Sequence, residues 1–200
     1  MQRRHLLLSA VALAALSACS GPYTIRSEVT SFGTWPAGRA PGSYAFERLP
    51  SQQQEGSRQT ELEDAARVAL EKAGFRPAAD AKSADVLVAL GVRVSTQERA
   101  PWDDPLWWRW HGNINAWRYG RMGRSYYYPP HYPVDRRYDR EVALLLRDRG
   151  SSEPLYEARA SNDGLTQGDA DLISAMFEAA LSDFPNTRPE PHAIAVQRVR

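Results

Sequence analysis

The run from Asp85 to Gln97 is the feature that most constrains how this 200-residue chain folds. Its first half is almost entirely apolar, whereas apolar and polar residues alternate after Gly91. A strand that is covered on two faces at its start and on one face later has this pattern. We therefore predict a central strand, which needs other strands at its edges and helices against a face.

Two amphipathic helices are predicted, one on each side of this strand in the sequence. From Thr60 to Ala73 the apolar residues recur at helical spacing, with Thr60 as the cap and Gly74 as the stop. The second helix runs from about Gln167 to Phe184, before Pro185. Further strands are predicted from alternation and turn signals over residues 43–49, 140–147, 155–161 and 194–199.

These elements predict an α+β fold, a two-layer sandwich in which two helices cover one face of a mostly antiparallel sheet of about five strands. Residues 19–43 are expected to form a lipidated N-terminus and tether, in which a weak alternation from Ile25 to Ser31 predicts a possible edge strand. The α+β domain is expected over residues 44–200, with an insertion over residues 101–138.

The first residues have the organisation of an export signal. Arg3 and Arg4 precede an uncharged, mainly apolar run from Leu6 to Ala15, as in a signal peptide. This run is shorter than the roughly 20 apolar residues that a membrane-spanning helix needs. We therefore expect residues 1–18 to be a lipoprotein signal peptide that is removed, rather than a membrane anchor.

The end of this signal resembles the bacterial lipobox. It reads Leu16, Ser17, Ala18 and Cys19, and Cys19 is the only cysteine in the chain. The resemblance implies lipidation of the Cys19 thiol and anchoring to a membrane; an ordinary cleavage site before a chance cysteine is the alternative. Because Ser20 rather than an aspartate follows, the resemblance also implies the outer membrane of a Gram-negative cell, with the domain in the periplasm.

Charge and cysteine content limit the partners of the mature protein. Removing Arg3 and Arg4 changes 25 basic against 24 acidic residues into 23 against 24. A nearly neutral protein has no global field that attracts nucleic acid, so none is expected as a partner. With Cys19 lipidated, no disulfide can form within the chain, and stability must come from packing.

Several positions resemble those of a family of short bacterial lipoproteins, the domain of unknown function 4136 (DUF4136). The resemblance covers about residues 25–185 and implies the fold and the envelope location, but it assigns no catalytic or binding residue. It rests on Tyr44 and Phe46 in the early strand, on Ala73, Gly74 and Phe75 after the first helix, on Ala84 to Val88, and on Phe184 and Pro185 after the last helix.

Residues 101–138 are unusually rich in aromatic side chains and arginine, and hold five of the six tryptophans. A loop of nearly forty residues is uncommon inside a compact domain and is usually functional or disordered. Aromatic rings and guanidinium groups make good binding anchors. The residues expected to contact a partner or ligand are Trp107, Trp108, Arg109, Trp110, Trp117, Tyr126, Tyr127 and Tyr128.

Several interpretations of this insertion stay open at this point. The leading hypothesis is that it presents a surface to an envelope protein or a glycan. The main alternative is a binding module for a small ligand or a lipid. The rings also suit two other roles: covering the open end or exposed face of the sheet, with arginines as amphipathic lids, or seating the protein in the head-group layer of a membrane.

No catalytic set is predicted. The chain has no Gly-x-Ser-x-Gly turn and no phosphate-binding glycine loop, and a lipidated cysteine is not a nucleophile. The histidines His111, His131 and His192 lack the spacing of metal ligands. We therefore expect no enzymatic activity, no cofactor and no metal, with a hydrolase as a distant third possibility.

Overall fold

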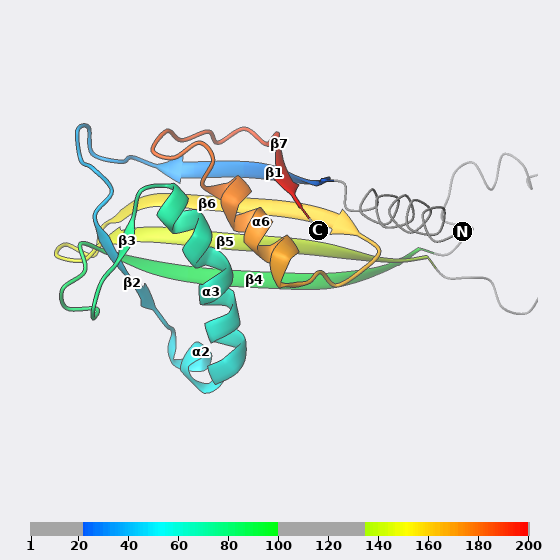
Figure 1. The fold of residues 1–200 in the computed structure, drawn as a ribbon, viewed down its shortest axis with the longest axis horizontal. Helices are drawn as coiled ribbons and strands as arrows, with labels where there is room; N and C mark the ends of the chain where they lie inside the picture. The colour runs from blue at the N-terminus through cyan, green and yellow to red at the C-terminus, as the bar shows by residue number, and fades with distance from the viewer. Residues whose placement is uncertain (1–21, 100–134, 200) are drawn as a thin grey trace, which may run out of the picture. The chain divides into compact units, whose positions relative to one another are not determined.

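The computed structural model describes residues 22–99 and 135–199. These residues form a mixed α/β fold with one open sheet of seven strands in the order β3-β2-β4-β5-β6-β1-β7 (Figure 1). The strands are β1 (Tyr23–Gly33), β2 (Ser43–Glu47), β3 (Arg76–Pro77), β4 (Val86–Arg99), β5 (Asp135–Asp148), β6 (Pro154–Gly164) and β7 (His192–Arg198). The helices within the described residues are α2 (Pro50–Gln54), α3 (Gly56–Lys72) and α6 (Ala170–Ala180).

The described residues divide into two compact units. The larger unit contains residues 22–92, 141–162 and 168–199, and therefore all three of these helices. The smaller unit contains residues 93–99, 135–140 and 163–167. Within the smaller unit, Arg137 pairs with Asp163 at 2.8 Å, and Arg140 donates a hydrogen bond to the carbonyl of Thr166 at 3.2 Å.

The sheet is larger than the sequence predicts and is partly parallel. The prediction of about five strands is wrong, because the sheet has seven, and the sheet is partly parallel, because β2 runs parallel to β3 and to β4. The chain between β2 and β4 carries α2 and α3, and a helical crossover of this kind is what parallel pairing requires. Antiparallel pairing holds where β1 meets β6 and β7.

Strand β1 lies inside the sheet, between β6 and β7, rather than at the edge expected for Ile25 to Ser31. The inward positions alternate as predicted, with Ile25, Ser27, Val29 and Ser31 all buried. The alternation is weak in the sequence because two of the four inward residues are serines. The hydroxyl of Ser31 accepts a hydrogen bond from the backbone N–H of Arg188 at 2.8 Å, which satisfies this buried polar group.

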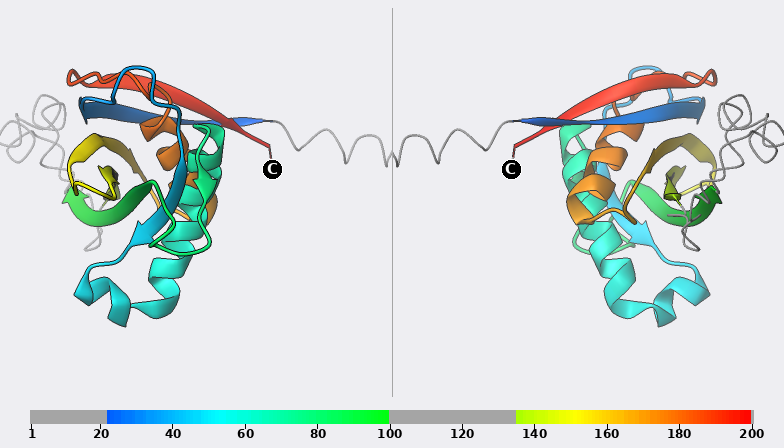
Figure 2. Two further views of the ribbon diagram at one scale, coloured as in Figure 1. Left: turned by 90° about the vertical axis from the view of Figure 1, so that its left-hand side faces the viewer. Right: turned by 90° about the vertical axis from the view of Figure 1, so that its right-hand side faces the viewer.

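Helices α3 and α6 lie on the same face of the sheet and pack against each other (Figure 2). Helix α3 begins at Gly56, before the predicted start at Thr60, whereas α6 is shorter than predicted. Asp169 caps α6 by accepting a hydrogen bond from the backbone N–H of Leu172 at 2.9 Å. The helices and strands bury a common core that includes Leu62, Ala66, Leu70, Val86, Val88, Leu90, Val142, Leu144, Leu146, Met176 and Phe177.

Phe75, which follows α3, and Phe184, which follows α6, belong to one aromatic cluster. The ring centroid of Phe184 lies 4.8 Å from that of Trp35, 5.1 Å from that of Phe75 and 5.2 Å from that of Tyr156. Edge-on and tilted contacts at these separations are the arrangements that aromatic pairs prefer. Phe75 is 2 % exposed and therefore folds back into the core.

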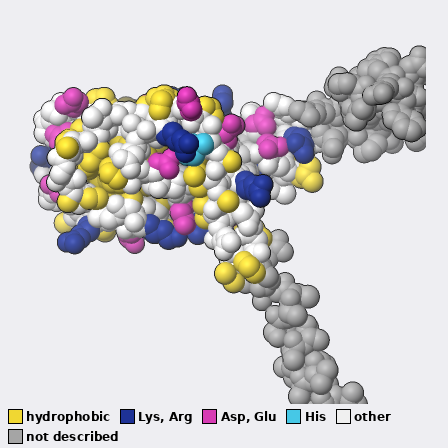
Figure 3. Space-filling view, turned by 90° about the horizontal axis from the view of Figure 1, so that it is seen from above, with side chains coloured by type: hydrophobic (Ala, Val, Ile, Leu, Met, Phe, Trp, Pro, Cys, Tyr) yellow, Lys and Arg dark blue, Asp and Glu magenta, His cyan; other side chains and the backbone are white. Residues whose placement is uncertain are grey.

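The side of the larger unit that carries β1 and β7 has a mixed surface. Figure 3 shows basic and acidic side chains interspersed with hydrophobic ones over this side, rather than gathered by sign. Such a surface creates no strong local field, which agrees with the nearly neutral charge of the sequence.

Asp148 closes the turn between β5 and β6. Its carboxylate accepts hydrogen bonds from the backbone N–H groups of Gly150 and Ser151, each at 2.9 Å, and pairs with Arg39 at 2.8 Å. The backbone hydrogen bond from Ser151, followed by the guanidinium of Arg39, lowers the pKa of Asp148 from 3.8 to about 2. The ionised form is therefore stabilised by folding.

Because the pKa of Asp148 is depressed in the folded state, its ionised carboxylate contributes fully to the free energy of unfolding above pH 3.8. This contribution is lost as the pH falls toward about 2. We expect Asp148→Asn to lower the free energy of unfolding at neutral pH and to reduce its fall over this acid range. Denaturant titrations across the range measure both effects. Glu61→Gln, at an exposed position of α3, is the control; an Asp148→Asn protein with unaltered pH dependence contradicts the assignment.

A polar pocket beside strand β4

The residues that the sequence singles out lie outside the described ranges. Cys19 precedes residue 22, and the aromatic and arginine residues expected to contact a partner fall between residues 99 and 135. Their roles stay predictions. These residues are Trp107, Trp108, Arg109, Trp110, Trp117, Tyr126, Tyr127 and Tyr128.

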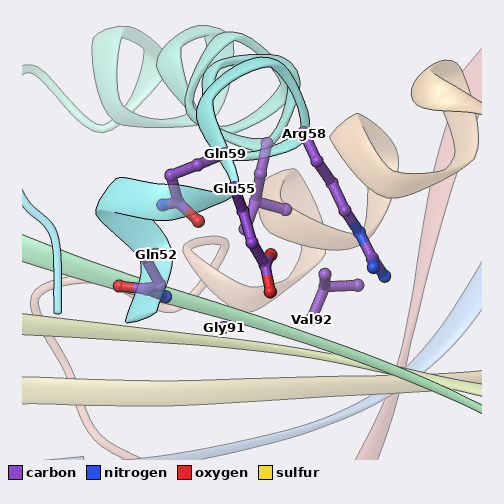
Figure 4. Close-up of a pocket in the computed structure, with 7 residues that line it drawn as sticks. Gln52, Glu55, Arg58, Gln59, Gly91 and Val92 are labelled. Carbon is purple, nitrogen blue, oxygen red and sulfur yellow. The ribbon is translucent and has the colours of Figure 1, made fainter. Parts of the chain in front are cut away.

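The larger unit contains a pocket between α2, the start of α3 and β4, with a volume of about 270 Å³ (Figure 4). Leu62 and Val92 supply apolar surface, and the other side chains that line it are polar or charged. Small-molecule sites usually measure about 300–1,000 Å³, so this pocket suits a ligand smaller than a typical drug. Its lining residues are Gln52, Glu55, Arg58, Gln59, Leu62, Gly91 and Val92.

The pocket lies where β4 continues beyond the end of β2. The two strands pair only as far as Glu47 and Ala89, so the next carbonyl, that of Leu90, has no β2 residue opposite it. The Nε2 of Gln52 donates to this carbonyl at 2.8 Å, and its Oε1 accepts from the backbone N–H of Leu49 at 2.9 Å. A side-chain amide on α2 thus takes the place of the missing strand partner.

A paired charge holds the connection from β2 to the helices. The guanidinium of Arg48 donates to both carboxylate oxygens of Glu63, at 2.6 Å and 2.8 Å. Glu63 is buried in α3, and its hydrogen bond raises the pKa of Arg48 above its usual value. Bidentate pairing fixes geometry as well as charge. It therefore orients the first turns of α3, which form one wall of the pocket.

Gln59 is the polar side chain most deeply buried in the pocket wall. It is 3 % exposed, and its amide makes no hydrogen bond with any residue that the structure describes. Its side chain extends from α3 toward Gln52 and β4 in Figure 4. Native proteins satisfy the large majority of buried side-chain polar atoms. An unpartnered amide that faces a pocket is therefore available to a ligand.

Glu55 and Arg58 bring one charge of each sign to the pocket. Both are exposed, and neither forms an ion pair within the described part of the chain. Figure 4 shows both side chains pointing from the start of α3 toward β4, on either side of Val92 in that view. The pocket therefore combines an anionic group, a cationic group and an amide at one place.

The polar and charged side chains that line the pocket can form hydrogen bonds and ion pairs with a ligand. The lining residues include no serine, cysteine or histidine that would act as a nucleophile or as a general base beside one. Within residues 22–99 and 135–199, no group of three or more His, Cys, Asp or Glu side chains is placed to hold a metal ion. No helix in the described part of the chain has the length and apolarity needed to cross a membrane.

The sequence contains one signal for this pocket, the glutamine at position 59. The predicted helix start at Thr60 leaves Gln59 outside the helix, whereas the helix begins at Gly56. Gln59 then falls three residues before Leu62, on the inward stripe of α3. A polar residue at an inward position of an amphipathic helix is the feature that indicates a buried polar site.

The fold is thus a mixed α/β domain with a single open sheet and a small polar pocket. The family model "Domain of unknown function (DUF4136)" matches residues 28–186, and the chain belongs to this family. The predicted family resemblance is confirmed. No curated protein matches the chain.

The solved structures that are similar to this chain include the following three. A PDZ domain protein from Parabacteroides distasonis shares 11 % identity with a TM-score of 0.49, over 94 % of this chain and 42 % of its own. A PelC dodecamer from Paraburkholderia phytofirmans shares 12 %, with a TM-score of 0.36, over 81 % and 96 %. A DUF4136 family protein from Bacteroides thetaiotaomicron shares 18 %, with a TM-score of 0.37, over 80 % and 96 %. The chain thus spans less than half of the first of these proteins.

Proposed function

We propose that the protein is a non-enzymatic lipoprotein of the bacterial cell envelope, anchored to the outer membrane by lipid on Cys19, with its domain in the periplasm. The observation that carries this proposal is the position of the single cysteine at the end of an apolar export segment. Three acyl chains on one residue hold a protein on a membrane far more firmly than the marginal binding that one myristoyl chain gives.

The number of residues between Cys19 and the first strand limits the distance between the folded domain and such an anchor. Strand β1 begins at Tyr23, four residues after Cys19, whereas the sequence predicted a tether as far as residue 43. An extended chain spans at most about 3.3–3.6 Å per residue, so four residues reach roughly 14 Å. A protein lipidated at Cys19 therefore holds the start of β1 close to the membrane surface.

The partner of the protein is proposed from the composition of residues 101–138. In the leading proposal these aromatic and arginine residues contact an envelope protein or a glycan. The alternative is a small-ligand or lipid-binding module that uses the same residues. Both proposals rest on the capacity of tryptophan, tyrosine and arginine to act as binding anchors.

The anchor is tested by mass spectrometry of the N-terminal peptide from the membrane fraction, beside a Cys19→Ala protein. We expect acyl mass on Cys19 in the wild type, and an unprocessed or released protein in the variant. Ser20→Ala, which keeps the cysteine, is the control and is expected to stay lipidated. An unmodified thiol on a protein that is not membrane-bound would overturn the proposal.

The partner surface is tested by replacing Trp107, Trp108 and Arg109 together with alanine. Anchor residues of this kind typically contribute 2 kcal/mol or more each to binding, so crosslinked envelope partners should be lost while the free energy of unfolding stays unchanged. Crosslinking in intact cells and denaturant unfolding are measured side by side, with Phe32→Ala, at an exposed position of β1, as the control. Lower stability with retained partners would instead show that these residues only cover the sheet.

A further inference from the structure

We propose that the pocket beside β4 binds a short zwitterionic peptide of about two residues. The unpartnered amide of Gln59 recognises the peptide bond, Glu55 receives the terminal ammonium group and Arg58 receives the terminal carboxylate. This site belongs to the larger unit and uses none of the residues on which the proposed anchor and partner surface rest.

The amide of Gln59 defines the central group of the ligand. An amide side chain both donates and accepts hydrogen bonds, and a peptide bond offers the complementary acceptor and donor. Gln52 cannot compete for Gln59 easily, because its own amide is held by Leu49 and Leu90. A ligand that carries a peptide group therefore satisfies the one buried amide of the pocket wall that has no described partner.

The two charges define the ends of the ligand. Glu55 and Arg58 are three positions apart at the start of α3, a spacing that places Cβ atoms about 5–6 Å from each other. An extended dipeptide spans roughly 7 Å, whereas a single amino acid spans about half of that. Both side chains extend beyond their Cβ atoms, so their charged groups can reach the two ends of an extended dipeptide.

The size and polarity of the pocket limit the rest of the ligand. A volume of about 270 Å³, with only Leu62 and Val92 as apolar lining side chains, leaves room for small side chains and little apolar contact. Affinity then depends on polar groups, and the buried amide is worth more than the charges. Losing Gln59 is expected to weaken binding about tenfold or more. Losing either exposed charge is expected to weaken it about two- to fivefold, and less at high salt.

The test is isothermal titration of the purified full-length protein with L-alanyl-L-alanine. We expect saturable binding at one site. Gln59→Met should weaken this binding most, and Glu55→Gln and Arg58→Gln should each weaken it less. Gln54→Met, Glu61→Gln and Arg76→Gln lie at exposed positions that do not line the pocket, and are the matched controls. Because Glu55 and Arg58 are exposed, their variants test the proposal even if Gln59→Met fails to fold.

Blocked ligands test which end each charge recognises. The N-acetyl dipeptide lacks the ammonium group, so Glu55→Gln should not weaken its binding further. The dipeptide with a C-terminal amide lacks the carboxylate, so Arg58→Gln should not weaken its binding further. No saturable binding at about 10 mM overturns the proposal. Equal affinity for the blocked and free dipeptides also overturns the proposal, because the charges would then not be recognised. Equal affinity for free alanine and the dipeptide overturns it too, because the peptide bond would then not be recognised.

Discussion

The parallel pairing of β2 with β4 is the constraint on which the helix-bearing face of the larger unit depends. The register runs from Tyr44 opposite Val86 to Glu47 opposite Ala89, and two parallel neighbours must be joined by a crossover. The chain between them passes over one face of the sheet as α2 and α3, and α3 packs beside α6 to bury the core. Because β2 has 5 residues and β4 has 14, β4 extends past its partner, and the pocket lies in that region.

Periodicity predicted the individual elements better than their pairing. The central strand, the strands around Val142 and Tyr156, and the two amphipathic helices follow from spacings that burial imposes directly on the sequence. The parallel neighbour of β4 was missed, although a strand, a helix and a strand in succession are typical of a parallel crossover. The pattern of β1 predicts only an edge strand because two buried serines dilute it, and the hydrogen bond that Ser31 accepts becomes visible only in the folded chain.

The candidate site shows a similar limit. Composition directed attention to Cys19 and to residues 101–138, because a lone cysteine and a concentration of tryptophan stand out in any sequence. The pocket residues are ordinary glutamines and charges, and no local pattern connects residues 52–62 with Gly91 and Val92. The shortness of β2, the hydrogen bond from Gln52 to Leu90 and the packing of α3 on the sheet bring these segments together. A sequence pattern reveals a buried side chain more readily than it reveals the absence of a partner for that side chain.

We infer that Gln59 is kept for a ligand rather than for the stability of the fold. A buried amide without a partner costs the folded state about 1–3 kcal/mol, and solvent in the open pocket reduces this cost. The direct measurement is the free energy of unfolding of Gln59→Met without ligand, compared with the wild type. We expect the free energy of unfolding to increase by up to about 1 kcal/mol, since an apolar side chain of similar size removes the unsatisfied group. A decrease of about 1 kcal/mol or more would contradict it, because Gln59 would then be a structural residue.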